Sequence, residues 1–145
     1  MADGSQEDYE MLGELYTGHT QGELVDNMVG LLKIMKGPKL GYQIDRYDHS
    51  LQSASRALRA DERPDLVIGC LLHDIADPIA PANHSATAAA MLRPYVDDEV
   101  HWVVKHHGLF QGYYYFHHMG GDRSARDVHK AVSYTHLTLP TIYSV

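Results

Sequence analysis

An adjacent histidine and aspartate, His73 and Asp74, form the pair in this sequence that is best suited to metal chemistry. A neutral imidazole and a carboxylate are both ligands of divalent transition metals. Neighbouring helical residues point about 100° apart, so the two side chains suit a helix end better than one helix face. There the imidazole can hold one ion while the two carboxylate oxygens bridge to a second. An isolated pair of this kind is more often a capped or solvated helix end.

Three further histidines give the pair a context, in a chain that carries eleven histidines among its 145 residues. His49 precedes His73 by 24 residues, and His84 and His107 follow, each on a separate predicted helix. Buried imidazoles without partners cost free energy, whereas a divalent ion turns them into satisfied ligands. We therefore predict a metal site built from His49, His73, Asp74, His84 and His107.

Two adjacent histidines compete for the last of these positions, and helical spacing decides between them. His107 continues the apolar stripe of its helix and is expected to point inward, whereas His106 lies one position round the helix. His106 is therefore expected to be exposed, or to contact the metal ligands without binding the metal itself. His101 is predicted to point outward. Solvated surface positions are predicted for the remaining candidates, His19, His129 and His136.

The spacing of apolar residues predicts an all-α chain, because even the β-branched residues fall within helical periods. Five helices are predicted. The first has a capping box at Thr20 and Glu23 and stops at Gly37-Pro38, and the second covers 47–60. The third runs from Pro64 to about 75. The fourth is capped by Asn83 and ends before Pro94, and the fifth runs from Asp97 to Gly108. The third helix is apolar almost all round, as expected of a central helix. An aromatic-rich loop or irregular helix is expected over 108–127.

Composition excludes several classes of protein. The formal net charge of −7 disfavours nucleic acid and anionic membranes as partners. No apolar run is long enough to span a membrane, and the acidic N-terminus is unlike a signal peptide, so we expect a soluble, cytoplasmic protein. The single cysteine, Cys70, has apolar neighbours and is predicted to be a buried thiol in a reducing compartment.

The ordered series His49, His73-Asp74, His84 and His107 resembles the motif of the HD-domain superfamily, over roughly residues 42–113. The resemblance implies an HD-domain helical bundle and a divalent metal centre, dinuclear and containing Fe or Mn. Two branches compare well: metal-dependent phosphohydrolases, and mixed-valence di-iron oxygenases such as myo-inositol oxygenase and the organophosphonate-cleaving oxygenase. The segment 48–54, the 24-residue step and Tyr113 resemble the oxygenases.

Two further positions bear on this resemblance. Asp77 matches an acidic residue that assists proton transfer in nucleotide-hydrolysing members, although an Asp-Pro turn that ends a helix explains it equally well.

The closing aspartate of the family motif is missing, because Asp122 and Asp127 follow His107 too closely. Residues 131–145 lack charge and helical period and resemble the tails of truncated translations. We therefore expect an incomplete HD domain at 1–130, truncated at its C-terminus, followed by a non-native tail.

The leading functional hypothesis is a metal-dependent phosphohydrolase that acts on a small phosphate or phosphonate substrate, with Asp77 as a catalytic residue. The first alternative is a mixed-valence di-iron oxygenase that cleaves a C–P or C–C bond, with His84 and His107 completing the second iron site. The second alternative is a non-catalytic HD module that binds a ligand.

Overall fold

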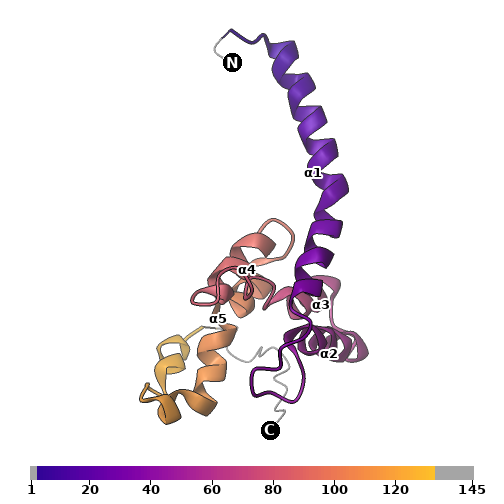
Figure 1. The fold of residues 1–145 in the computed structure, drawn as a ribbon. Helices are drawn as coiled ribbons and strands as arrows, with labels where there is room; N and C mark the ends of the chain where they lie inside the picture. Colours follow the sequence, from indigo (N-terminus) through magenta and orange to yellow (C-terminus); the bar gives the residue numbers. More distant parts are fainter. Residues whose placement is uncertain (1–2, 133–145) are drawn as a thin grey trace.

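The computed structural model describes residues 3–132 of the chain, and within them every regular element is helical. The elements are α1 (Gln6–Ile34), α2 (Arg46–Arg59), α3 (Pro64–Leu72), α4 (His84–Leu92), α5 (Asp98–Tyr115) and the 3₁₀ helices η1 (Phe116–Met119) and η2 (Ala125–His129). The prediction of an all-α bundle of about five helices is confirmed (Figure 1). His136 and the predicted non-native tail from residue 133 onward lie outside the described residues.

The central helix α3 packs against α2 on one side and α5 on another, and α4 packs against α5. Small residues permit the close contact of α3 with α5: a Cβ atom at Gly69 would lie 2.6 Å from Cγ1 of Val100. The buried face of α2 likewise consists of small residues, Ser50, Ser53 and Ala57. The predicted central position of the third helix therefore agrees with its packing.

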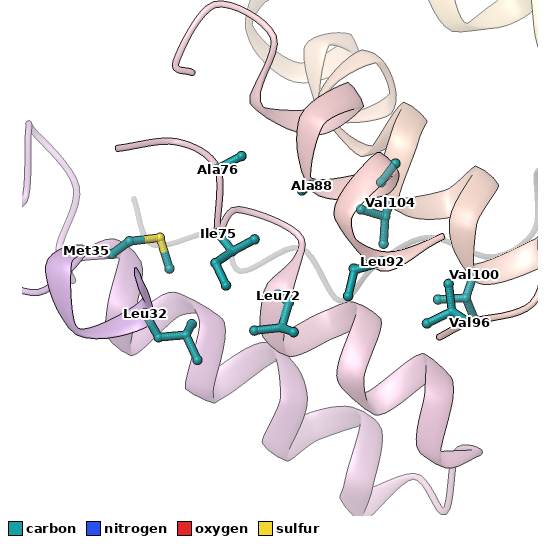
Figure 2. Close-up of a cluster of buried hydrophobic side chains, with 11 residues drawn as sticks. Leu32, Met35, Leu72, Ile75, Ala76, Ala88, Leu92, Val96, Val100 and Val104 are labelled. Atoms are coloured by element: carbon teal, nitrogen blue, oxygen red, sulfur yellow. The ribbon is translucent and has the colours of Figure 1, made fainter. Parts of the chain in front are cut away.

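The main core lies where α3, α4 and α5 meet the end of α1. Figure 2 shows Leu32 and Met35 from this end of α1 beside Leu72 and Ile75, with Leu92 across the core. The earlier turns of α1 extend away from the bundle and expose apolar side chains (Figure 1). The exposed residues include Tyr9, Met11, Leu12, Leu15, Tyr16 and Val25. The part of α1 that contributes to the core is thus its last turns.

Asp45 fixes the entrance of α2, the helix that carries His49. The Asp45 carboxylate accepts hydrogen bonds from the Asp48 backbone N–H, as an N-cap, and from the Gly37 N–H, both at 2.9 Å. These bonds lower the pKa of Asp45. α1 ends at Ile34 with Met35 as its C-cap, three residues before the predicted stop at Gly37, and Gly37 has a φ of +128°, a conformation that favours glycine.

Three predicted helix boundaries are wrong. α1 begins after Ser5, which forms a capping box with Asp8, and Thr20 lies inside the helix with its hydroxyl donating to the Tyr16 carbonyl at 2.8 Å. α3 ends at Leu72 and does not reach residue 75. α5 continues through Gly108 to Tyr115. Gly108 serves close packing instead of termination, because a Cβ atom there would lie 3.1 Å from Oγ of Ser85.

Candidate metal centre

The five predicted ligands converge from four helices. His49 lies in the first turn of α2, His73 is the C-cap of α3 with Asp74 directly after it, His84 is the first residue of α4, and His107 lies midway along α5. Their ligand atoms form two groups, each with all atoms within 4.8 Å of one another. Group one contains His49, His73 and Asp74; group two contains Asp74, His84 and His107. Asp74 belongs to both.

The two oxygens of Asp74 face different histidine pairs. Oδ2 lies 3.4 Å from Nε2 of His73 and 3.9 Å from Nε2 of His49. Oδ1 lies 3.2 Å from Nε2 of His107 and 3.4 Å from Nε2 of His84. Each oxygen with its pair of nitrogens is a three-atom donor set, and Asp74 is common to both sets.

The spacing of the nitrogens fits ligands that share an ion. Nε2 of His49 lies 3.1 Å from Nε2 of His73, and Nε2 of His84 lies 3.3 Å from Nε2 of His107. Two nitrogens bound at about 2.1 Å to one tetrahedral ion lie roughly 3.4 Å apart. The donor set therefore fits a divalent metal in size as well as in chemistry.

Backbone carbonyls orient three of the four imidazoles. Nδ1 of His73 donates to the Cys70 carbonyl at 2.8 Å, and Nδ1 of His107 donates to the Val104 carbonyl at 2.7 Å. Nδ1 of His84 faces the Pro81 carbonyl at 3.2 Å. A carbonyl oxygen only accepts, so the proton lies on Nδ1 and the Nε2 lone pair points into the cluster. His49 has no comparable backbone acceptor among residues 3–132.

Burial sets the charges of the cluster. It lowers the pKa of His73 to about 4, against the opposing charge of Asp74, and it also lowers the pKa of His49. Burial alone would raise the pKa of the Asp74 carboxyl, but the neighbouring imidazoles of His73 and His107 outweigh it and hold this pKa well below its usual range. The lowered pKa values favour the neutral imidazoles of His49 and His73 and the ionised carboxylate of Asp74, which are the forms that bind cations.

Asp77, the predicted catalytic residue, lies at the edge of the cluster, in the turn that contains His73 and Asp74. Its backbone N–H donates to the Asp74 carbonyl at 2.9 Å. Its Oδ1 pairs with Nη1 of Arg46 at 2.9 Å and lies 3.8 Å from Nδ1 of His84. Arg46 is absent from the predicted site residues. Its position three residues before His49, on the same side of a helix, is the signal that would have indicated it.

The other histidines do not join the cluster. His106 packs against Trp102 and His129 on the outer side of α5, with ring centroids 4.8 and 4.5 Å away. His101 is partly buried, and His19 is exposed and pairs with Glu23 at 3.5 Å. The predicted solvated position of His129 is wrong, because η2 packs against α5 and brings this ring to the aromatic side chains there.

The acidic and basic residues after α5 contact groups outside the cluster. Asp122 accepts from the Ser124 N–H at 2.8 Å, and Asp127 pairs with Lys130 at 2.7 Å. Neither aspartate belongs to a metal-ligand group in the described part of the chain. The guanidinium carbons of Arg123 and Arg126 lie 4.3 and 3.8 Å from the Tyr113 ring centroid. These arginines therefore stack on an aromatic ring.

The family model described as HD domain matches residues 46–137, a span that contains every residue of the cluster as well as Asp77. The chain belongs to the HD domain family. HD domains bind divalent metals and are commonly metal-dependent hydrolases, and the histidine–aspartate cluster of this HD domain can hold a metal. No curated protein matches the chain. Within residues 3–132, no helix is both long and apolar enough to cross a membrane.

Proposed function

We propose that this HD domain is a metal-dependent phosphohydrolase acting on a small phosphate-containing substrate. The observation that supports the proposal is the placement of one carboxylate, Asp74, between two histidine pairs, with one oxygen toward each. We propose His49, His73, Asp74, His84 and His107 as the ligands of a dinuclear centre of Fe or Mn. When bound, such ions neutralise phosphate charge and lower the pKa of a coordinated water to ~7.

The protein's own groups have three tasks in this proposal. Asp74 holds both halves of the centre together through Oδ1 and Oδ2. The carbonyls of Cys70 and Val104 keep His73 and His107 in the correct tautomer and orientation. Asp77, 3.8 Å from the His84 ring, is the carboxylate proposed to orient the attacking water and take up its proton.

A mixed-valence di-iron oxygenase is the second candidate, and one observation favours it. The second group, Asp74 with His84 and His107, is as complete as the first, and a centre with four imidazoles is suited to iron. An oxygenase of this kind would open a C–P or C–C bond with O₂. Its ligands would be those of the hydrolase, so ligand geometry alone does not separate the two activities.

Metal exchange separates them, because hydrolysis needs only a Lewis acid whereas oxygenation needs a metal that changes valence. The purified chain is loaded in turn with manganese and with iron. Phosphate release from nucleoside and sugar phosphates is measured without oxygen, and oxygen uptake is measured with hydroxylated phosphonates and polyols. The Asp74→Ala variant provides the background rate.

Anaerobic phosphate release by the manganese-loaded protein is the expected result. Turnover that requires both iron and oxygen, with an electron paramagnetic signal from a half-reduced iron pair, would replace the hydrolase by the oxygenase. Metal binding without either activity would identify a non-catalytic HD module.

A further inference from the structure

Arg46 forms an ion pair with Asp77 at the edge of the histidine–aspartate cluster. Its Nη1 lies 2.9 Å from Oδ1 of Asp77, so the first residue of α2 is joined to the turn after α3. The same oxygen of Asp77 lies 3.8 Å from Nδ1 of His84. One carboxylate therefore lies between a guanidinium and an imidazole of the cluster.

Two geometric observations place the Arg46 guanidinium beside the cluster. Arg46 precedes His49 by three residues, a separation at which helical side chains are neighbours on one face. Its Nη1 also pairs with Oδ1 of Asp77, the oxygen that lies 3.8 Å from the His84 ring. The guanidinium thus lies near His49, a proposed metal ligand of the group that also contains His73 and Asp74.

The chemistry of this guanidinium suits an anionic ligand. The Arg46 side chain is 32% exposed, so it is held in place yet still reachable from solvent. Arginine carries five N–H donors in a planar fork, and the contact with Asp77 is made through Nη1 alone. The remaining donors match the oxygens of a phosphate group, which arginine binds through two parallel hydrogen bonds.

We propose that Arg46 is the residue of this site that recognises the substrate's phosphate group, and that Asp77 positions the Arg46 side chain for this task. The proposal rests on the proposed hydrolase function and adds a specificity-determining residue to it. The positioning role of Asp77 is compatible with proton uptake by the same carboxylate. Arg46 acts on binding and contributes no ligand to the ions.

The test compares Arg46→Gln, which removes the charge, with Arg46→Lys, which keeps the charge but loses the planar fork. Arg59→Gln is the matched control, because Arg59 lies exposed in the last turn of the same helix. Metal content, the midpoint of thermal unfolding and the binding of inorganic phosphate to the manganese-loaded protein are measured for each. Turnover of a phosphomonoester gives kcat and KM separately.

Arg46→Gln is expected to weaken phosphate binding and to raise KM by about tenfold or more, with metal content unchanged. Arg46→Lys should recover part of the loss, and Arg59→Gln should match the unmodified protein. Asp77→Asn should raise KM as well, whatever its effect on kcat. A rise in KM in Arg46→Gln but not in Asp77→Asn would overturn the positioning role of Asp77.

Other outcomes separate this proposal from the proposed function. Unchanged phosphate binding and KM in Arg46→Gln would overturn the role of Arg46 and leave the hydrolase intact. Equal losses of metal, thermal stability and phosphate binding would show that the ion pair only ties α2 to the turn. Lack of turnover in the unmodified protein, with phosphate binding that still depends on Arg46, would overturn the hydrolase and support Arg46 as an anion-binding residue.

Discussion

The two halves of the cluster are alike in burial and different in how firmly their histidines are held. Each half has one deeply buried ring, His73 or His107, with side chains 1% and 2% exposed, and one shallower ring, His49 or His84, at 20% and 24%. In the second half, both rings have a backbone carbonyl facing Nδ1. In the first half only His73 does, and His49 lies farther from Asp74, at 3.9 Å.

Two donor groups that share a carboxylate are therefore not equally organised in this protein. A ring already held by a carbonyl loses less freedom on binding, so its contribution to affinity is larger. We therefore expect the second half, between α4 and α5, to hold its ion more tightly than the first half, between α2 and α3.

The largest effect is expected from Asp74→Ala, because this change removes the donor that both halves share. The variant should lose most bound metal of both halves, as measured by elemental analysis of the purified protein. His101→Ala, which changes a partly buried histidine outside the cluster, is the control and should keep its metal. Full retention of metal in a folded Asp74→Ala variant would show that the carboxylate does not bridge the two halves.

A smaller effect should distinguish the two shallower histidines. His84→Ala removes an oriented ring and His49→Ala an unheld one, so the loss of metal affinity should be larger for His84→Ala, by about tenfold. Competition with a chromophoric chelator measures both affinities. Equal losses would mean that the backbone contact of His84 contributes nothing to binding, and a larger loss for His49→Ala would reverse the expected order of the two halves.

The helix that brings His49 to the first half also carries two buried hydroxyls. The Oγ atoms of Ser50 and Ser53 are buried and have no hydrogen-bond partner among residues 3–132. Ser50→Ala and Ser53→Ala each delete a buried hydroxyl and its desolvation cost, so each should raise the free energy of unfolding by about 1 kcal/mol. Urea unfolding of the metal-free protein measures this, with Ser55→Ala as control. A loss of more than about 1 kcal/mol would instead reveal a partner for the hydroxyl.

Apolar periodicity and histidine spacing were sufficient to predict α2 to α5 and the convergence of the five candidate ligands, because both depend on local helical geometry. Features that depend on contacts between distant segments were missed. Gly108 has the residue type of a helix end, and only its close approach to Ser85 shows why a glycine is suited to a position inside the helix. The ion pair of Arg46 with Asp77 joins residues on two different elements, so the spacing of Arg46 and His49 indicates that Arg46 lies near the cluster but does not identify its partner.

Cys70, the residue whose backbone carbonyl contacts His73, also carries a buried thiol. The Cys70 side chain is buried, as predicted, and the Cys70 carbonyl orients His73. Burial raises the pKa of the thiol to about 11, from a usual value of 9.0. Because the thiolate is the reactive form, alkylation of the folded protein at pH 8 should be slow, and it should become fast in denaturant.

The raised pKa of Cys70 also predicts a dependence of stability on pH. The folded state favours the neutral thiol, so the stability from this group is fully present below the unfolded pKa of about 9 and is lost as pH rises toward about 11. Cys70→Ala should remove this part of the decline, as measured by thermal unfolding between pH 8 and pH 11. Metal in the first half should slow alkylation further, because an ion bound to His73 holds the end of α3 in place. If metal slowed alkylation equally in His49→Ala and in the unmodified protein, the slower alkylation would not depend on metal bound in the first half. Alkylation of Cys70 could then not be used to compare metal binding in the two halves.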